Sequence, residues 1–233
     1  DLHSFPTRRS SDLVVAGKEI VLLDPGGAHV FPRVLANVAE LVDLKSIRHI
    51  FYSHQDPDVS SGITLWLSMA EKATVHISEL WVRFLPHFGV YDERRIASIP
   101  DRGETLTLSG GVRLVMVPSH FLHSTGCFSL YDPRAKILFT GDIGAALFPK
   151  GKRYPVVTDF EAHLPYMEGF HRRYMASNAA CRSWVRSVRS LDIETIAPQH
   201  GAVIQGRENV GKFLSWFEGL RCGTDIIDQI YGR

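Results

Sequence analysis

The segment SHQDPDVSSG, Ser53–Gly62, carries three ligand-type side chains at alternate positions: His54, Asp56 and Asp58. Imidazole nitrogens and carboxylate oxygens bind transition metals, and several of them close together can hold more than one ion. Single residues of this kind have simpler explanations, because an aspartate after a strand is often a helix cap or a turn residue. The chemistry therefore depends on which other residues join them.

Three more residues of the same kind follow apolar stretches further along the chain. His123 lies in HFLHS, Asp142 ends KILFTGD, and His200 lies in APQHG. Taken one at a time, each is more simply explained as a turn residue. The joint pattern favours a metal site, because helix caps do not require this ordered set of histidines and aspartates.

The elements that must position these residues are apolar strands that end at a histidine or an aspartate. Hydrophobic periodicity predicts mixed strands and helices with turns between them. The predicted strands include 19–24, 47–53, 74–78, 104–108, 112–118, 127–132, 136–142 and 194–198, and the predicted helices are 31–44, 60–72, 79–88, 166–190 and 206–220. A long loop is expected at 144–165. Strand ends are where sites assemble in layered α/β folds, so the four ligand-bearing turns are expected to converge.

Composition narrows the class of protein. The chain has 233 residues, a net charge of +1 and 45% hydrophobic residues, enough for a substantial core. No basic cluster indicates nucleic-acid binding, and no apolar run is long enough for a membrane helix, so neither partner is expected. Cys127, Cys181 and Cys222 show no Cys-x-x-Cys spacing, which favours reduced thiols and a cytoplasmic location.

The N-terminal stretch differs from the rest of the chain. SFPTRRSSDL, Ser4–Leu13, has no strand or helix periodicity and no signal-peptide core, and it resembles a translated adapter oligonucleotide. Residues 1–13 are therefore expected to be non-native. One domain is expected over residues 14–233, with the first strand of the fold missing.

The ordered motifs resemble the metallo-β-lactamase superfamily. LLDPGG, SHQDPDVSSG, HFLHS, FTGD and APQHG occur in the order and approximate spacing of that superfamily, over nearly the whole chain from Val14. The diiron branch is the most similar: the lactamase domain of flavodiiron proteins and, above all, the stand-alone oxygen-binding diiron proteins. The resemblance implies a four-layer αββα sandwich with a binuclear metal centre and no catalytic group beyond that centre.

Carried over by position, the resemblance places His54, Asp56 and His123 on one metal ion. Asp58 and His200 would bind the second ion, and Asp142 would bridge the two. One position departs from the superfamily pattern: the residue after Asp58, often a histidine, is Val59, which cannot bind a metal. The second ion would then have an open position for solvent or a small molecule.

The ligand set favours iron over zinc. Three imidazoles and three carboxylates, with a bridging hydroxide, would neutralise two divalent ions. Asp56 stands where zinc enzymes of the superfamily usually have a neutral histidine, and a harder, more anionic site suits iron or manganese. Two iron ions are therefore expected, with zinc or manganese as alternatives, and no flavin is expected within this chain.

Other polar residues are weaker candidates. His120, His163 and Tyr166 could support or cover the site, with Glu161 beside them on the long loop. His171 and Tyr174 share a helical face and could belong to the core or to the outer part of the site.

The expected function is the binding or reduction of O₂, or of NO, at a non-haem diiron centre. The protein would be an oxygen sensor, or an oxidoreductase that takes electrons from a separate redox protein. A signalling partner and a homo-oligomer are both compatible with the sequence. A zinc-dependent metallo-hydrolase is the alternative, and Asp56 and Val59 count against it.

Overall fold

The computed structural model describes residues 12–233. It has a mixed α/β fold with two sheets flanked by helices, as predicted. The chain folds as two compact units. The N-terminal unit, as described, comprises residues 12–116, and the C-terminal unit comprises Val117–Arg233. Each unit carries half of the predicted ligand set.

A five-stranded sheet forms the centre of the N-terminal unit, in the order β1-β2-β3-β4-β5. Its strands are β1 (Asp12–Ala16), β2 (Glu19–Leu23), β3 (Ile47–Phe51), β4 (Thr74–Ser78) and β5 (Ile96–Ile99). β1 and β2 form an antiparallel hairpin, and β2 to β5 run parallel. The carboxyl ends of the parallel strands therefore meet at one edge, where β3 leads into His54.

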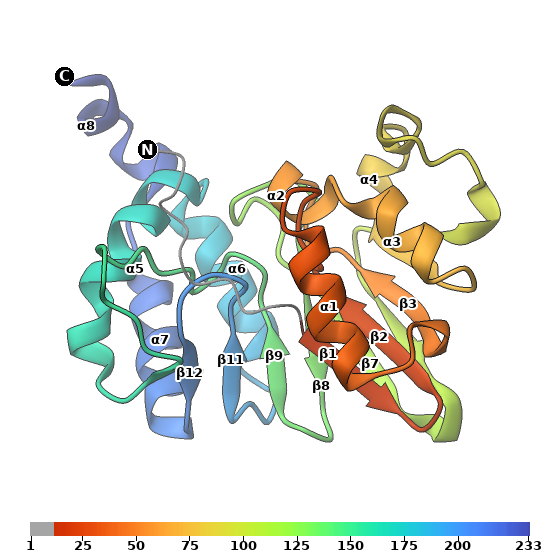
Figure 1. Cartoon of the computed structure of the whole chain (residues 1–233). Helices are drawn as coiled ribbons and strands as arrows, with labels where there is room; N and C mark the ends of the chain where they lie inside the picture. Colours follow the sequence, from red (N-terminus) through yellow and green to blue (C-terminus); the bar gives the residue numbers. More distant parts are fainter. Residues whose placement is uncertain (1–11) are drawn as a thin grey trace. The chain divides into compact units, whose positions relative to one another are not determined.

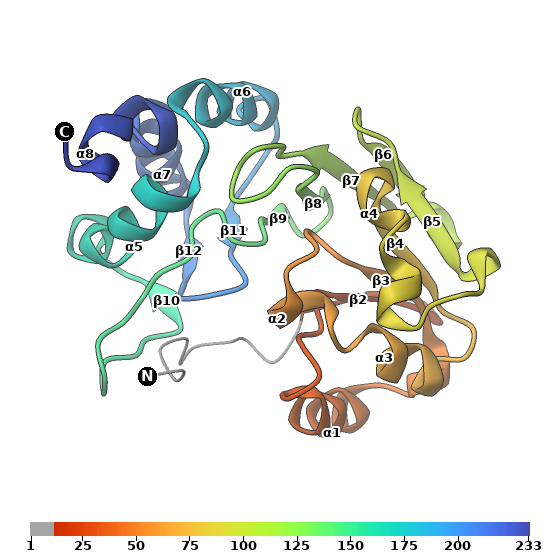
Figure 2. The same ribbon diagram turned by 90° about the horizontal axis from the view of Figure 1, so that it is seen from above.

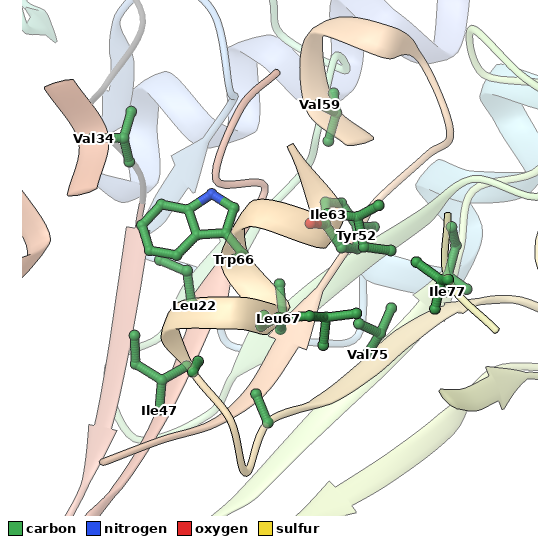
Figure 3. Packing of buried hydrophobic residues seen from close by; sticks show 14 of the residues in the cluster. Leu22, Val34, Ile47, Tyr52, Val59, Ile63, Trp66, Leu67, Val75 and Ile77 are labelled. Atoms are coloured by element: carbon green, nitrogen blue, oxygen red, sulfur yellow. The ribbon is translucent and has the colours of Figure 1, made fainter. Parts of the chain in front are cut away.

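The helices of this unit include α1 (Phe31–Leu41), α2 (Pro57–Ser60), α3 (Ile63–Met69) and α4 (Glu79–Val82). α1 and α3 lie over the sheet (Figure 1). In Figure 3, Ile63, Trp66 and Leu67 of α3 lie over Leu22 and Ile47 of the strands. Trp66 is fully buried, and its ring meets that of Phe31 edge-on at 5.1 Å. This apolar layer fixes the helices that flank the ligand-bearing turn.

Short elements complete the N-terminal unit. Single-turn 3₁₀ helices occupy Leu44–Ser46, Leu85–Phe88, Glu93–Arg95 and Ser109–Gly111. The last of these lies in the connection between β6 (Glu104–Thr107) and β7 (Arg113–Pro118), which pair antiparallel. The predicted hairpin around Ser109-Gly110-Gly111 is therefore confirmed.

The C-terminal unit contains the strand order β10-β12-β11-β9-β8. These strands are β8 (Phe128–Asp132), β9 (Ile137–Phe139), β10 (Val156–Val157), β11 (Thr195–Ala197) and β12 (Val203–Gln205). The helices are α5 (Phe160–Tyr174), α6 (Asn178–Val188), α7 (Arg207–Gly219) and the terminal α8 (Ile227–Tyr231), preceded by a 3₁₀ turn at Gly223–Ile226. α5, α6 and α7 lie together on one side of these strands (Figure 2).

Several predicted helices are shorter than expected, or divided. The helix predicted over 60–72 is two helices, α2 and α3, separated at Gly62. A Cβ at Gly62 would collide with the Gly26 carbonyl, so this position needs glycine. The helix predicted over 79–88 ends at Val82 and resumes as a 3₁₀ turn that contains Pro86. Proline cannot donate a helical hydrogen bond, which accounts for the interruption.

The loop predicted over 144–165 is shorter than expected, because α5 begins at Phe160. Asp159 caps this helix by accepting a hydrogen bond from the Ala162 amide at 3.2 Å. Pro165, the last residue of the predicted loop, lies inside the helix. The short strand β10 also lies within the predicted loop.

Asp12 and Leu13, for which the sequence pattern indicated neither strand nor helix, are part of a strand. They begin β1 and pair with Leu23 and Leu22, because β2 offers an open edge whose backbone groups need partners. Residues 1–11 lie outside the described part of the chain. That residues 1–13 are non-native, and that the first strand of the fold is missing, stay predictions. No helix within residues 12–233 is long and apolar enough to cross a membrane.

Two histidines face each other on neighbouring strands of the N-terminal unit. His49 of β3 and His76 of β4 share a hydrogen bond of 3.0 Å between Nδ1 and Nε2. Burial and, to a smaller extent, the neighbouring His49 lower the pKa of His76 to about 4. Since its ordinary pKa is 6.5, the unfolded chain takes up this proton more readily than the folded one.

We therefore expect the free energy of unfolding to fall as the pH drops from about 6.5 to about 4, with His76 contributing up to about 3 kcal/mol. Urea denaturation across this range should give a flatter pH dependence for His76→Leu than for the wild type. His29→Leu, at an exposed histidine, is the control and should keep the wild-type slope. Equal slopes in His76→Leu and the wild type would contradict the assignment.

Candidate metal centre

The parallel pairing of β9 with β11 places two predicted ligands at the same edge of the C-terminal unit. Phe139 pairs with Ala197 at the ends of the two strands. Asp142 lies three residues after Phe139, and His200 lies three residues after Ala197. The two predicted ligands are therefore the same number of residues beyond the end of their strands. The Gln199 amide donates to the Gly141 carbonyl at 2.7 Å, which ties the two turns together.

Asp142 lies between two predicted ligand histidines. Its Oδ2 is 3.6 Å from Nε2 of His123, and its Oδ1 is 3.6 Å from Nε2 of His200. Asp142 and His200 are buried, and the His123 side chain is only 10% exposed. Each carboxylate oxygen thus faces a different imidazole, as required of a carboxylate that bridges two metal ions held by those imidazoles.

A strained loop presents His123. Its φ of +81° and the φ of +64° at Phe121 are unusual for residues with a side chain. The loop is held at both ends, since the Ser119 amide donates to the Cys127 carbonyl at 2.9 Å and the Phe121 amide donates to the Ser124 carbonyl at 2.9 Å. Phe170 and Tyr174 of α5 flank the His123 ring at centroid distances of 5.7 and 5.4 Å. Such strain persists only where the surroundings determine the conformation.

The N-terminal unit orients His54 through a chain of hydrogen bonds. Asp24, at the end of β2, accepts from the Ser53 amide at 2.7 Å. The Ser53 hydroxyl lies 2.8 Å from Nδ1 of His54, and both side chains are buried. A histidine held through Nδ1–H can present the lone pair of Nε2 to a metal.

Asp56 and Asp58 come directly after His54 at the start of α2. Asp56 occupies the N-cap position of this helix, but its carboxylate makes no capping hydrogen bond. Asp58 lies in the first turn, and both are half-buried. Val59 is fully buried in the hydrophobic cluster, so the position where the superfamily often has a histidine packs into the core.

The weaker candidates lie in the C-terminal unit. His120 is half-buried and lines a cavity of about 650 Å³ between the 118–121 loop and α6. His163 is completely buried, and its Nδ1 lies 2.7 Å from the Tyr154 hydroxyl. The Tyr166 hydroxyl accepts a hydrogen bond from Lys152. These contacts explain their packing, and a role for them beside the metal stays a prediction.

Sequence reasoning left His171 undecided and missed Ser53 and Asp24. Nε2 of His171 accepts the Gly144 amide hydrogen at 2.8 Å, and Nδ1 donates to the Met167 carbonyl at 2.8 Å. Both ring nitrogens are therefore engaged, and burial lowers the pKa of His171 to about 4, which keeps the ring neutral. His171 thus holds the turn two residues beyond Asp142. The helical spacing of His171 and Tyr174 was the available sequence signal for their position on one face of α5.

The chain matches the family model "ODP family beta lactamase" over residues 8–201. The chain belongs to the ODP family. A solved structure of a peroxy diiron species of the chemotaxis sensor ODP is 50% identical in sequence, has a TM-score of 0.86, and aligns over 94% of this chain and 89% of its own. The apo state of the chemotaxis sensor ODP from T. denticola matches with the same identity and TM-score and covers 90% of that chain. The predicted diiron branch of the metallo-β-lactamase fold is thus confirmed.

More distant relatives are flavoproteins. A putative diflavin flavoprotein A 1 from Nostoc sp. is 24% identical over 213 residues, which cover 88% of this chain and 36% of the relative. A diflavin flavoprotein A 1 from Synechocystis sp. is 27% identical over 212 residues and is covered to 35%. The chain therefore spans about a third of the length of these curated relatives. A variant of the flavo di-iron protein from Thermotoga maritima shares the fold, with a TM-score of 0.76 at 22% identity.

The turn after β2 packs closely against the ligand segment of the N-terminal unit. A Cβ added at Gly27 would lie 2.6 Å from the Pro57 carbonyl oxygen and 3.3 Å from the Asp58 Cα. The Ala28 amide also donates to the Ser61 hydroxyl at 3.0 Å. Gly27 is therefore required for the backbone position of Asp58.

We expect Gly27→Ala to lower the free energy of unfolding by about 1–3 kcal/mol and to weaken metal binding, because the new methyl group must displace α2. Urea denaturation and metal titration would measure the two effects. Gly211→Ala in α7 is the matched control, since a Cβ there would meet no side chain of the described residues within 4 Å. A Gly27→Ala protein with wild-type stability and metal affinity would show that the turn can shift without consequence.

Proposed function

We propose that the chain holds a non-haem diiron centre that binds O₂. The observation that carries the proposal is the position of Asp142, whose two oxygens face the imidazoles of His123 and His200. Each carboxylate oxygen of this buried side chain lies 3.6 Å from a histidine Nε2, which is longer than a hydrogen bond. Such a separation suits a metal ion bound by both the oxygen and the nitrogen. The residues present therefore fit a metal pair.

The six predicted ligands are proposed to meet in one centre. His54, Asp56 and His123 would hold one iron, Asp58 and His200 the other, and Asp142 would bridge the ions. Ser53 would keep His54 in the tautomer that binds through Nε2, and Asp24 would hold the Ser53 backbone in place. Val59 supplies no donor, so the second ion would keep a position open for a small ligand.

Iron is proposed in preference to zinc or manganese. Three carboxylates offset the positive charge of two metal ions more fully than the single aspartate of a histidine-rich zinc site. They also stabilise the ferric state of iron. Iron at this site would supply the electrons for reversible O₂ binding or for reduction of O₂ or NO. The relation to ODP, of which a peroxy diiron species has been solved at 50% identity, supports the same metal.

Oxygen sensing is proposed in preference to O₂ reduction. The solved structures at 50% identity are those of a chemotaxis sensor, and this chain covers 89% of one of them. An oxidoreductase would need electrons for every turnover, from a separate redox protein. A sensor needs only a signalling partner that distinguishes the ligand-bound state, and we propose that such a partner exists in the cytoplasm.

Zinc-dependent hydrolysis is the second candidate, and the metallo-β-lactamase fold itself is the observation that favours it. Two ions and a bridging hydroxide can hydrolyse esters, thioesters or lactams. Asp56 counts against this activity, because its added negative charge lowers the Lewis acidity that polarises a substrate carbonyl.

Metal analysis and O₂ mixing test the proposal. Protein expressed without oxygen, with iron and zinc both supplied, should contain about two iron ions per chain and bind about one O₂ per reduced centre without sustained turnover. Sustained O₂ consumption with a reduced flavoprotein would indicate an oxidoreductase instead. One zinc ion per chain and no iron would contradict the diiron assignment.

Two variants test the bridging role of Asp142. Asp142→Asn should deplete both metal sites, because an amide brings no charge to either ion. His200→Ala should leave about one iron per chain, because it removes a ligand of one ion only. Iron content and thermal unfolding of both variants would measure this. The loss of a single ion in Asp142→Asn would contradict the bridge.

A further inference from the structure

Two of the three cysteines form a buried thiol pair in the C-terminal unit. Cys181, on α6, and Cys222, just before the terminal 3₁₀ turn, have their Sγ atoms 3.7 Å apart, although 41 residues separate them in the chain. Both are completely buried and reduced. A disulfide needs about 2.05 Å between the sulfurs, so a small movement of either side chain would join them.

The two thiols are chemically unequal. The hydrogen bond from Cys181 lowers the pKa of Cys222, against the opposing effect of burial. The same hydrogen bond raises the pKa of Cys181, and burial raises it further. The pKa of Cys181 is thus raised and that of Cys222 lowered, so Cys222 has the greater thiolate character. Such asymmetry is typical of an attacking thiol beside a resolving thiol.

The turn that carries Cys222 is anchored to the connection between α5 and α6. The Asp225 carboxylate accepts from the Cys222 amide at 3.1 Å and from the Asn178 amide at 2.6 Å. The Thr224 amide donates to the Ala176 carbonyl at 2.8 Å. Gly223 has a φ of +50°, and a Cβ added there would collide with the carbonyl oxygen of Ala176.

The same connection continues to the loop of a predicted ligand. The Ala176 amide donates to the Phe121 carbonyl at 3.0 Å, and Leu122 forms an isolated bridge with Met175. His123 follows directly. A covalent bond between Cys181 and Cys222 would therefore fix the turn, the α5–α6 connection and, through it, one side of the His123 loop.

We propose that Cys181 and Cys222 form a disulfide under hydrogen peroxide, with Cys222 as the attacking thiol and Cys181 as the resolving thiol. The Cys222 sulfur attacks one peroxide oxygen and forms an S–O bond, while the O–O bond breaks. The other peroxide oxygen departs as water, and Cys222 becomes a sulfenic acid. The Cys181 sulfur then attacks the Cys222 sulfur, forms the S–S bond and displaces the sulfenic acid hydroxyl as water. Two thiols and one peroxide give one disulfide and two waters, and the two thiol sulfurs together lose two electrons.

Access to the buried pair is provided by the terminal segment. α8 has no buried residue, and Tyr231 and Ile227 are 68% and 46% exposed. Helices with little buried surface open locally at low free-energy cost. Opening of α8 together with the 223–226 turn, which breaks the hydrogen bonds of Asp225 and Thr224, would expose Cys222 while the remainder of the unit stays folded. The proposal does not rest on a metal at the predicted centre.

The experiment is quantitative thiol alkylation and peptide mapping of the full chain in its native state, during a hydrogen peroxide titration. We expect a Cys181–Cys222 cross-linked peptide to appear and to be reversed by dithiothreitol, while Cys127 remains alkylatable after unfolding. Oxidation at Cys127 alone, or a cross-link that forms only in denaturant, would overturn the proposal. The wild-type protein suffices for this measurement.

Three variants assign the two thiols. Cys181→Ser should leave a sulfenic acid at Cys222 that dimedone traps, and Cys222→Ser should leave Cys181 at least about tenfold slower to react with peroxide. Cys127→Ser, at the other buried cysteine, is the matched control and should form the disulfide at the wild-type rate. Faster oxidation of Cys181 in Cys222→Ser than of Cys222 in Cys181→Ser would reverse the assigned roles and refute that part of the proposal.

Hydrogen exchange tests the link to the His123 loop. In the oxidised wild type, the amides of Ala176 and Thr224 should exchange about tenfold more slowly than in the reduced protein, because the disulfide suppresses opening of the turn. Amides of β8 serve as the internal control. Unchanged exchange at Ala176 on disulfide formation would show that the thiol pair does not stabilise the connection to Phe121.

Discussion

The parallel pairing of β9 with β11 is the constraint on which the C-terminal half of the metal centre depends. Because Phe139 and Ala197 are partners, three further residues on each strand bring Asp142 and His200 to one edge. A shift of the pairing by one residue would reverse the faces of β11 and direct its buried side chains outward. Metal ligation therefore depends on the same register that buries Leu138 and Ile196.

Strand register alone does not position the predicted ligands, because several of them lie in turns with unusual backbone conformations. His123, at φ of +81°, and Gly201, at φ of +99°, lie beside or within the ligand set, and Gly201 has Ala146 where a Cβ would be. Such turns are unfavourable for ordinary residues, so neighbouring contacts must hold them. The Gly144–His171 hydrogen bond and the packing of Phe170 and Tyr174 around His123 are contacts of this kind. The helix α5 thus keeps the His123 loop and the Asp142 turn in place from outside the ligand set.

The strands that end at predicted ligands, β3, β7, β9 and β11, were predictable from sequence, because branched and aromatic apolar residues are concentrated in them. Elements fixed by distant partners were not predictable. β12 has three residues and exists through its pairing with β10 and β11, and the need for glycine at position 62 follows from its contact with Gly26. At the site, residue type indicated the candidate ligands, whose metal binding stays a prediction, but the hydroxyl of Ser53 and the carboxylate of Asp24 carry no sequence signal of their contacts to His54 and Ser53.

The buried histidines show how the protein separates structural imidazoles from ligand imidazoles. His171 engages Met167 and Gly144 through its two ring nitrogens, and burial alone would keep it neutral. Neither nitrogen can then turn to a metal without leaving the Gly144 amide hydrogen unsatisfied. In His54 the ring is oriented through Nδ1 by Ser53, which is the arrangement that binding through Nε2 requires. His54 and His171, both buried, thus differ in the protein groups that meet their ring nitrogens, and this difference supports the proposed ligand role of His54.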